Sequence, residues 1–295
     1  MADVRRTEPA LVSVVVPVHN DAGVLRSQLE CLTAQDYEGA WEVVIADNGS
    51  TDGSTDVARA HADRFSRLVI VDASARRGVC FARNTGADAA SGDFLVFSDA
   101  DDEVEPGWLA ALTDAARSYD VVGGQLDHDA LNRGPVRAWR PGPNSTDRLP
   151  VALDFLPYVF SANCGIWRDT LDAVGGWNEE YPGCTDVEMS WRVQLAGYRL
   201  GFAPEAVVRY RYRTTPRGLA RQYFRIGSGE SRLYRDFGRR GLRRHVRAAL
   251  RTWAWIAVNL PFAGFRHERR GFWARVAARR LGRLSGSLRA RTFFP

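Results

Sequence analysis

The 295-residue sequence contains no lysine, so all 40 of its basic residues are arginine. It has only four cysteines, Cys31, Cys80, Cys164 and Cys184, which lie far apart and form no CxxC pair. We therefore expect reduced, buried thiols of a cytosolic protein rather than disulfides or a zinc site. The missing lysine excludes a Walker loop, and no Gly-x-Gly-x-x-Gly follows the first apolar run, so P-loop NTPases and Rossmann dehydrogenases are both disfavoured.

Long apolar runs are also missing. The N-terminus, "MADVRRTEPA", is polar and does not resemble a signal peptide. The uncharged run at residues 253–265 has 13 residues and contains Asn259 and Pro261. As a helix it would span about 20 Å, short of the ~30 Å hydrocarbon core of a bilayer. We expect no transmembrane helix.

Acidic residues are scarce in the last third of the chain. Residues 213–295 hold 21 arginines and three acids, Glu230, Asp236 and Glu268, whereas residues 1–212 hold 19 arginines and 32 acids. The formal charge is therefore near −13 before residue 213 and near +18 after it. This split predicts two regions, 1–212 and 213–295, with different partners.

The first region alternates apolar β-branched runs with segments of helical spacing. Strands are predicted at 11–18, 41–47, 67–71 and 93–99, and helices after Asp21, around 58–62, at 78–90 and with Pro106 in a first turn. With 45% apolar residues the chain can bury a substantial core. This alternation predicts an α/β fold with a mostly parallel sheet that helices cover on both faces.

Polar clusters follow three of the predicted strands: His19-Asn20-Asp21, Asp47-Asn48-Gly49-Ser50 and Asp99 to Asp102. In open α/β sheets, ligands bind outside the carboxyl ends of the strands. Any one cluster is equally well explained as a solvated loop, but all three fall on one rim. Because that rim is acidic, a phosphate ligand there would need a cation.

The acidic cluster lies in "FLVFSDADDEVEPGW", where an apolar strand leads into four acids within five positions. Carboxylates spaced Asp-x-Asp at a strand end suit Mg²⁺ or Mn²⁺, which share their coordination with substrate phosphates. We assign Asp99, Asp101 and Asp102 to function. Glu103 and Glu105 are assigned to the start of the next helix, where acids favour the positive helix end.

Four motifs in order resemble the family 2 glycosyltransferases of the GT-A fold: "VSVVVPVHND", "EVVIADNGSTDGST", "RRGVCFARNTGADAASGDFLVFSDADDEVEPGWL" and "GGWNEEYPGCTDVEMSWRVQLAGYRLGFAPEAVV". The resemblance covers about residues 11–212. It implies a GT-A catalytic domain at 1–212 and an enzyme of the hexosyltransferase type. Such an enzyme moves a sugar from a nucleoside diphosphate donor, here a UDP- or dTDP-sugar, to an acceptor hydroxyl and inverts the configuration at the anomeric carbon. The product would serve glycan, cell-envelope or glycoconjugate synthesis. The metal would be Mg²⁺ or Mn²⁺.

The resemblance also implies roles for individual residues on the donor side. Asp47 would bind the base, and Asp99 and Asp101 match the DxD pair that holds the metal. The remaining donor residues are Pro17, His19 and Asn20 in the nucleotide pocket, Asn48 and Ser50 in the turn beside it, and Arg83 and Asn84 near the donor or the metal loop.

The catalytic base is expected in "GCTDVEMSWR". Relatives commonly have Glu-Asp there, whereas this chain has Thr185 and then Asp186. An inverting displacement needs one carboxylate to take the proton of the acceptor hydroxyl. We predict Asp186 for that role and hold Glu188 in reserve, although half a helical turn separates them. Asp186 alternatively caps the helix that follows it.

On the acceptor side, the resemblance points to Asn163, with Cys164 and Gly165 beside it. Trp177 either stacks on a sugar or packs in the core.

Two departures from the family pattern affect the metal and the diphosphate. The His that many metal-dependent relatives carry after the last strand is replaced by Arg209 and Tyr210, while His61 and His128 read as solvated surface positions. Gln222 and Arg225 keep a QxxR spacing but Ile226 replaces the Trp, so Arg225 is either a diphosphate contact or part of the basic tail.

The tail predicts amphipathic helices rich in arginine. One apolar stripe is Leu242, Val246, Leu250, Trp253, Ala257 and Leu260, and a second is Trp273, Val276, Leu281, Leu284 and Leu288. Such helices suit an anionic membrane surface, which would place the protein at the cytoplasmic face of the cell membrane. The stripes are equally those of helices packed on the catalytic domain. Specific nucleic-acid binding is not expected, because no reading motif is present.

Two other functions remain open. A sugar-1-phosphate nucleotidyltransferase has a similar α/β nucleotide fold, but no Gly-rich, Lys-containing signature of that class is present. A catalytically inactive membrane- or nucleic-acid-binding module is suggested by Thr185 and by the missing His. Release of pyrophosphate, release of a nucleoside diphosphate, or no turnover would separate the three.

Overall fold

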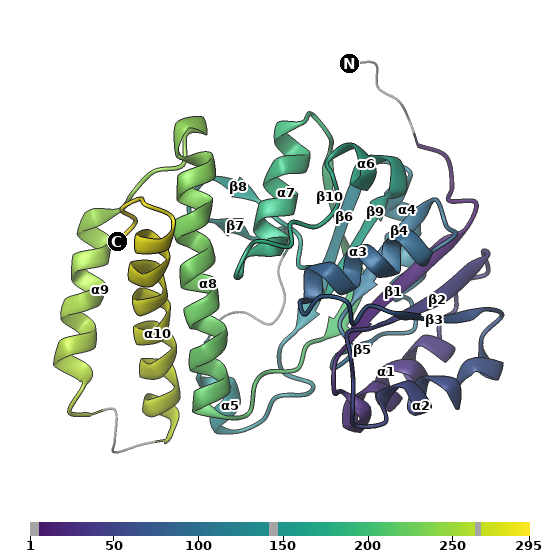
Figure 1. The fold of residues 1–295 in the computed structure, drawn as a ribbon, viewed down its shortest axis with the longest axis horizontal. Helices are drawn as coiled ribbons and strands as arrows, with labels where there is room; N and C mark the ends of the chain where they lie inside the picture. Colours follow the sequence, from purple (N-terminus) through teal and green to yellow (C-terminus); the bar gives the residue numbers. More distant parts are fainter. Residues whose placement is uncertain (1–5, 142–146, 263–266) are drawn as a thin grey trace.

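The computed structural model describes residues 6–141, 147–262 and 267–295 (Figure 1). The first five residues of the polar N-terminus and residues 263–265 of the uncharged run lie outside the described residues. Among the described residues, no helix has both the length and the apolar character needed to cross a membrane.

Within the described residues, eight strands form one sheet in the order β3-β2-β1-β4-β9-β6-β10-β5. Their bounds are β1 Val12–Val18, β2 Trp41–Asp47, β3 Leu68–Asp72, β4 Phe94–Ser98, β5 Glu103–Val104, β6 Val121–Asp127, β9 Asn163–Trp167 and β10 Leu200–Arg209. Strands β3, β2, β1 and β4 are mutually parallel, as the sequence predicts. Strand β9 runs antiparallel to β4 and β6, and β5 runs antiparallel to β10. A small second sheet pairs β7 (Val151–Ala152) with β8 (Leu156–Pro157).

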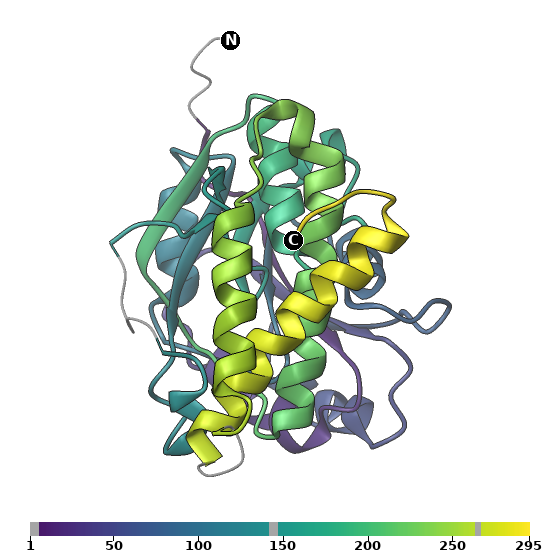
Figure 2. The same cartoon turned by 90° about the vertical axis from the view of Figure 1, so that its left-hand side faces the viewer.

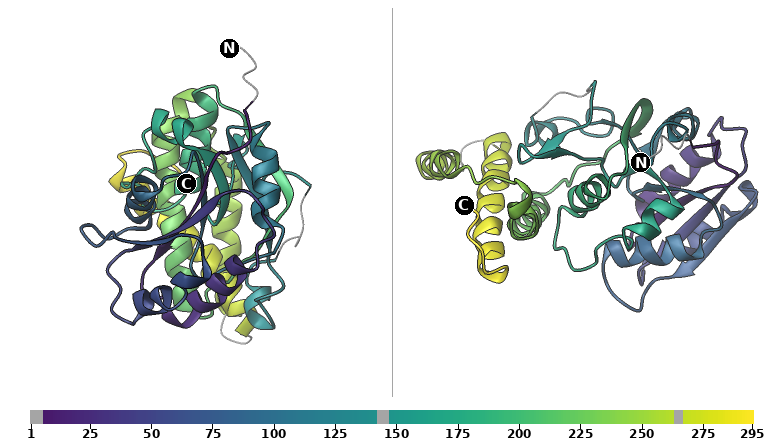
Figure 3. Two further views of the ribbon diagram at one scale, coloured as in Figure 1. Left: turned by 90° about the vertical axis from the view of Figure 1, so that its right-hand side faces the viewer. Right: turned by 90° about the horizontal axis from the view of Figure 1, so that it is seen from above.

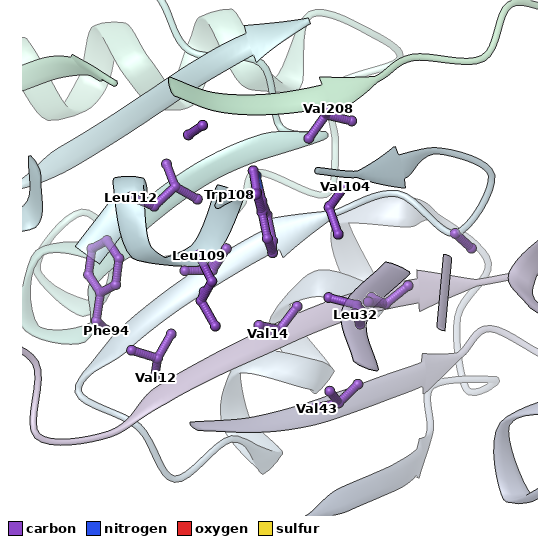
Figure 4. Close-up of a cluster of buried hydrophobic side chains, with 14 of the residues drawn as sticks. Val12, Val14, Leu32, Val43, Phe94, Val104, Trp108, Leu109, Leu112 and Val208 are labelled. Carbon is purple, nitrogen blue, oxygen red and sulfur yellow. The ribbon is translucent and has the colours of Figure 1, made fainter. Parts of the chain in front are cut away.

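Helices cover both faces of the large sheet. They are α1 Ala22–Thr33, α2 Ser54–Arg59, α3 Val79–Ala89, α4 Trp108–Ala116, α6 Arg168–Ala173 and α7 Thr185–Leu195. The short helix α5 (Pro135–Ala138) packs against the tail instead. Side chains of α1, α2 and α4 belong to one buried cluster, which Figure 4 shows around Trp108 and Val14. Side chains of α3, α6 and α7 belong to a second cluster on the other face. Because Val14 and Val15 point to opposite faces and both are fully buried, β1 has to be apolar at consecutive positions.

The tail forms three helices, α8 (Pro216–Phe237), α9 (Val246–Asn259) and α10 (His267–Arg289). Figure 2 shows them side by side, and Figure 3 shows them as a layer at the opposite end of the molecule from β1–β3. Helices α8 and α10 cross at glycines. A Cβ on Gly227 would lie 2.0 Å from the carbonyl oxygen of Arg279, and one on Gly282 would lie 2.1 Å from that of Phe224. The two backbones therefore touch where a side chain would separate them.

The predicted apolar stripes are mostly not buried. Leu250 is 64% exposed and Leu288 is 82% exposed, and Val246, Leu260, Leu281 and Leu284 are exposed as well. Leu242 is the buried member of the stripes, and other buried apolar positions of the tail include Leu233, Ala249, Ile256, Ala277 and Ala278. The interpretation that the stripes only pack on the catalytic domain is therefore wrong for these leucines and for Val246. Small residues make the interhelical contact and leave the large apolar side chains outside.

Candidate functional site

The carboxyl ends of β1 and β2 are joined into one rim by hydrogen bonds between their loops. The Asn20 amide donates to Ser50 Oγ at 3.1 Å, and the Thr51 amide donates to Asn20 Oδ1 at 2.8 Å. Within the second loop, the Ser50 amide donates to Asp47 Oδ1 at 3.0 Å. Asn20 has a positive φ of 57°, a conformation that asparagine adopts more readily than most residues. The structure thus brings Asn20, Asp47 and Ser50 together as predicted.

Two other predicted donor residues lie beneath this rim. Pro17 is buried within β1. Asn48 is also buried and uses its amide to hold the loop before α3, donating to the Arg76 carbonyl at 2.8 Å and accepting from the Gly78 amide at 2.9 Å. At the rim itself, His19 Nε2 lies 3.2 Å from the guanidinium of Arg77, a cation that the sequence reasoning did not single out.

The three aspartates form a compact cluster at the end of β4. Carboxylate oxygens of Asp99, Asp101 and Asp102 all lie within 4.8 Å of one another. Burial and then the charge of Asp99 raise the pKa of Asp101 to about 6, and the same two causes with Asp101 raise the pKa of Asp102 well above its usual value. Asp102 Oδ2 is buried without a hydrogen-bond partner. Such a set of mutually repelling oxygens fits a divalent cation.

Arginines from two distant segments partly neutralise the cluster. Arg83 on α3 is buried and donates to Asp99 Oδ1 at 2.8 Å. Arg213, just after β10, pairs with Asp101 Oδ2 at 3.1 Å. The amide of Arg211 donates to Asp102 Oδ1 at 2.7 Å, and its guanidinium donates to the Asp101 carbonyl at 2.8 Å. The segment after β10 therefore closes over the aspartates.

The assignment of Glu103 and Glu105 to a helix start is wrong. Helix α4 begins at Trp108 with Gly107 as its N-cap, so Pro106 precedes the helix and does not lie in its first turn. Glu103 belongs to β5 and pairs with Arg211 at 3.1 Å, while Glu105 pairs with Arg209 at 2.6 Å. Both glutamates fasten the acidic loop to the end of β10.

Asp21, which the sequence placed both in the first rim cluster and at the start of a helix, is a further acid at the rim. It stands at the N-cap position of α1 but makes no capping hydrogen bond, and its Oδ2 accepts from the His19 amide at 3.0 Å. Burial raises the pKa of Asp21, with the charges of Asp52 and Asp99 acting in the same direction and Arg213 opposing them. Asp21 therefore lies within electrostatic reach of the aspartate cluster.

Asp186 lies in the first turn of α7, where Cys184 is the N-cap residue. Asp186 Oδ1 accepts from the Val187 amide at 2.9 Å. Its pKa is raised mainly by burial; among charged groups, Arg83 lowers it and Asp99 raises it. The interpretation of Asp186 as the N-cap is wrong, although it does accept a main-chain hydrogen bond in the first turn. Arg83 links Asp186 to the aspartate cluster.

Helix α8 holds the loop that leads into Asp186. Arg225 Nε donates to the Pro182 carbonyl at 2.9 Å, and the Cys184 thiol donates to the Ile226 carbonyl at 3.3 Å. A Cβ on Gly229 would lie 2.1 Å from the carbonyl oxygen of Gly183. In this structure Arg225, an exposed residue, contacts the loop before the base rather than the aspartate cluster.

The predicted acceptor residues are occupied by internal contacts. Asn163 is fully buried, accepts from Trp108 Nε1 at 2.8 Å and donates to two carbonyls. Trp177 is buried against the ring of Phe97 and the guanidinium of Arg83. Of the two roles considered for Trp177, the structure shows packing in the core. Glu188 is buried and pairs with Arg192 at 3.0 Å.

Asn84 connects the donor side to the Trp177 loop. Its amide donates to the Trp177 carbonyl and to Glu179 Oε1, both at 2.9 Å, and accepts from the Trp177 amide. Gly165, next to Asn163, has no room for a side chain, because a Cβ there would lie 2.2 Å from the ring of Phe94. Asn84 and Gly165 therefore contribute to the packing around the site.

The prediction that His61 and His128 are solvated surface positions is wrong. His61 is buried, and its Nδ1 lies 2.8 Å from the Val57 carbonyl. His128 is half-buried between the rings of Tyr210 and Tyr212, and burial followed by the charge of Arg140 lowers its pKa to about 4. At the position where relatives carry a His, burial raises the pKa of Tyr210 to about 12, with the aspartate cluster adding to the shift.

Comparison with known proteins identifies the family. Residues 13–175, more than half of the chain, match glycosyl transferase family 2. The chain is 30% identical over 252 residues to glycosyltransferase AglE of Haloferax volcanii, which covers 84% of this chain and 80% of that protein. It is 39% identical over 121 residues to the undecaprenyl-phosphate 4-deoxy-4-formamido-L-arabinose transferase of Aeromonas hydrophila, covering 40% of this chain and 37% of that one.

A solved structure has the same GT-A fold. The mannosyltransferase PcManGT from Pyrobaculum calidifontis, in complex with GDP-Man and Mn²⁺, superposes with a TM-score of 0.62 at 19% identity, over 96% of this chain and 89% of that one. The fold, the family match and the identity to AglE agree. The chain belongs to glycosyl transferase family 2 and is a glycosyltransferase.

Proposed function

We propose that the enzyme is an inverting glycosyltransferase that moves a sugar from a nucleoside diphosphate donor to the hydroxyl of a membrane-borne acceptor. The observation that carries this proposal is one buried arginine that interacts with both halves of the site. Arg83 is hydrogen-bonded to Asp99 of the aspartate cluster, and its charge also acts on Asp186. The aspartate cluster and the proposed base therefore lie within electrostatic range of the same guanidinium.

The rim of β1 and β2 would hold the nucleotide. Asp47 presents a carboxylate at the strand end, where it would accept the imide N–H of uracil or thymine. We therefore propose a UDP- or dTDP-sugar as donor, with His19, Asn20, Ser50 and the neighbouring Arg77 around the base and diphosphate. PcManGT binds GDP-Man, and guanine also offers an N–H to a carboxylate, so GDP-sugars belong in any screen.

Asp99 and Asp101, with Asp102 beside them, would hold Mg²⁺ or Mn²⁺. The buried, unpartnered Asp102 Oδ2 and the raised pKa of Asp101 support this, because the arginines compensate the charge of the cluster only in part. When bound, the metal would neutralise charge on the diphosphate. The ion in the PcManGT complex is Mn²⁺.

Asp186 would act as the base. Its carboxylate would take the proton of the acceptor hydroxyl while the hydroxyl oxygen bonds to the anomeric carbon and the bond from that carbon to the diphosphate breaks. One displacement of this kind inverts the anomeric centre. Burial raises the pKa of Asp186 and so makes its carboxylate a stronger proton acceptor. The positive charge of Arg83 stabilises the ionised carboxylate.

We further propose that residues 1–212 form the catalytic domain and that residues 213–295 hold it at the cytoplasmic face of a membrane. The tail's 21 arginines and its exposed Val246, Leu250, Leu260, Leu281 and Leu288 support this, because apolar side chains among cations suit an anionic bilayer surface. One relative, the Aeromonas enzyme, is named for an undecaprenyl-phosphate acceptor.

Thermal shift with UDP, dTDP and GDP, each with Mn²⁺, Mg²⁺ or EDTA, tests the donor and metal assignment. We expect one base to raise the melting temperature only when the metal is present, because a ligand that binds the folded state stabilises it. Asp101→Asn should abolish the metal dependence. Asp72→Asn, which changes an exposed aspartate at the end of β3, is the matched control and should leave the shift unchanged. A shift that is the same in EDTA, or in Asp101→Asn, contradicts the proposed metal site.

A further inference from the structure

A cavity of about 240 Å³ lies among α8, α9 and α10, away from the aspartate cluster. Figure 2 shows these three helices facing the viewer. The side chains around the cavity are strongly basic: Arg275, Arg279, Arg280 and Arg283 of α10, with Tyr223 of α8 and Thr252 of α9. No lining residue is a carboxylate. We call this space the arginine cavity.

Among the described residues, one side-chain carboxylate pairs with any of these four arginines. It is Glu230 of α8, which forms ion pairs with Arg279 and Arg283. The other two arginines pair with no described side-chain carboxylate. Arg280 donates to Thr252 Oγ1 at 2.8 Å and to the Pro295 carbonyl at 2.9 Å. Arg275 lies over the rings of Tyr223 and Phe272, and its Nε is buried without a hydrogen-bond partner.

The arginine cavity therefore holds more positive than negative charge. Burial, followed by the charges of Arg283 and Arg279, lowers the pKa of Arg280 to about 10. The shift shows that burial, together with repulsion from the neighbouring guanidinium groups, disfavours the charge of Arg280. An anion bound among the arginines would relieve that repulsion, and the planar, forked guanidinium group suits phosphate oxygens.

A second cavity, of about 420 Å³, is lined by residues of α5, α9 and α10. It is mostly aromatic, lined by Trp255, Phe262, Phe272 and Trp273 with Ala138, Asn259 and Arg269. A side chain of each cavity contacts the other, because the guanidinium of Arg275 lies 4.8 Å from the ring centroid of Phe272. Phe262 is half exposed, so this aromatic cavity reaches the outer surface of the tail. The volume of the aromatic cavity alone falls within the range of roughly 300–1,000 Å³ that small-molecule sites occupy.

We propose that the two cavities together bind a lipid that carries a phosphate group, with the phosphate among the arginines and the apolar chain among the aromatic rings. The charge excess selects the head group, and the adjoining aromatic walls select an attached chain over a free anion. The inference rests on the proposed function in one respect: it names a phosphate as the group by which the membrane-borne acceptor is recognised.

Helix α8 connects this site with the loop before the base. Glu230, which pairs with Arg279 and Arg283, follows Gly229, where a Cβ would lie 2.1 Å from the carbonyl oxygen of Gly183. An acceptor lipid held by the arginines would therefore lie beside the helix that holds the Asp186 loop.

Isothermal titration calorimetry on the full chain, with no donor and no metal, tests the inference. The probes are farnesyl phosphate, farnesol, inorganic phosphate and dihexanoyl phosphatidic acid, each below its aggregation threshold. The test variant combines Arg275→Gln with Arg280→Gln, which spares the two arginines that neutralise buried Glu230. The control combines Arg247→Gln with Arg251→Gln, exposed arginines of α9 outside the cavity, and removes the same total charge.

We expect saturable binding of farnesyl phosphate, with farnesol and inorganic phosphate about tenfold weaker or more, since each lacks one half of the ligand. The cavity variant should weaken farnesyl phosphate by about tenfold or more, and the control by less than about twofold. Equal losses in the two variants, or none in the cavity variant, overturn the inference. Inorganic phosphate binding as tightly as farnesyl phosphate also overturns it.

Phosphatidic acid identifies the source of the phosphate lipid. Weaker binding than farnesyl phosphate supports an acceptor site, whereas equal binding with the same variant pattern supports the cavities as a site for bulk phospholipid. A second pair keeps the test independent of folding: Phe262→Ser in the aromatic cavity should weaken farnesyl phosphate binding by about tenfold, and Val151→Ser, an exposed apolar change in β7, should not. Binding without turnover supports this inference while refuting the proposed function, and turnover without binding does the reverse.

Discussion

Replacing Glu230 with Gln should destabilise the folded chain by about 3 kcal/mol near pH 7. Glu230 is 3% exposed and pairs with Arg279 and with Arg283, the latter at 2.7 Å. Burial alone would raise its pKa, but the two arginines outweigh burial and lower the pKa from 4.5 to about 2. A difference of that size between folded and unfolded pKa is worth about 3 kcal/mol when the carboxylate is ionised in both states.

The sign gives a pH dependence. Because the folded pKa is the lower one, the stabilisation is complete above the unfolded pKa of about 4.5 and is lost as the pH falls toward about 2. The deficit of Glu230→Gln should therefore shrink from about 3 kcal/mol at pH 7 to about 1.5 kcal/mol at pH 3. Urea unfolding of both proteins at the two pH values measures it, since the effects of other titrating groups cancel in the difference.

Glu180→Gln is the matched control. Glu180 also pairs with an arginine of α8, Arg232 at 2.7 Å, but its side chain is 78% exposed. An exposed pair contributes less than about 1 kcal/mol, so the control should stay within that limit at both pH values. A Glu230→Gln deficit that is no larger than the control's, or that does not change with pH, would refute the reasoning.

Two further predictions concern packing and the link between the halves of the site. Gly282→Ala should lower the free energy of unfolding by about 1–3 kcal/mol, because the new Cβ meets the Phe224 carbonyl, whereas Gly238→Ala, whose Cβ has 3.4 Å of room, should be close to neutral in the same urea titration. Arg83→Lys keeps the charge but loses the planar fork that contacts Asp99, so turnover should fall by about tenfold or more in a donor-consumption assay; unchanged turnover would show that Arg83 does not position the site.

The sequence allowed the first four strands to be predicted because each is apolar on both faces. Val14 and Val15 are both buried, and that signal is local. Strand β5 has two residues and exists only because β10 pairs with it, so no local pattern indicated it. The same long-range pairing overturned the interpretation of Glu103, whose partner Arg211 lies more than a hundred residues away in the sequence.

The sequence indicated that the aspartates would cluster, but it did not indicate which arginines would neutralise them. Asp99 and Asp101 stand where their spacing predicts, and Asp186 lies within reach of Arg83. Arg213 was missed, although the alternation "RYRYR" after the last strand was a visible signal for cations near the acids. In the tail, helical spacing located the apolar stripes correctly but did not reveal which face would be covered, because glycines rather than leucines make the α8–α10 contact.

The most direct test of the central claim is nucleoside diphosphate release from UDP-, dTDP- and GDP-sugars with Mn²⁺ by the wild type, Asp186→Asn and Glu188→Gln. We expect Asp186→Asn to lower the rate by about a hundredfold or more, since general-base catalysis contributes on that scale, while its thermal shift with the nucleotide stays that of the wild type. Glu188→Gln should retain turnover, because Glu188 is paired with Arg192. Wild-type turnover by Asp186→Asn, or loss of turnover only in Glu188→Gln, would contradict the account.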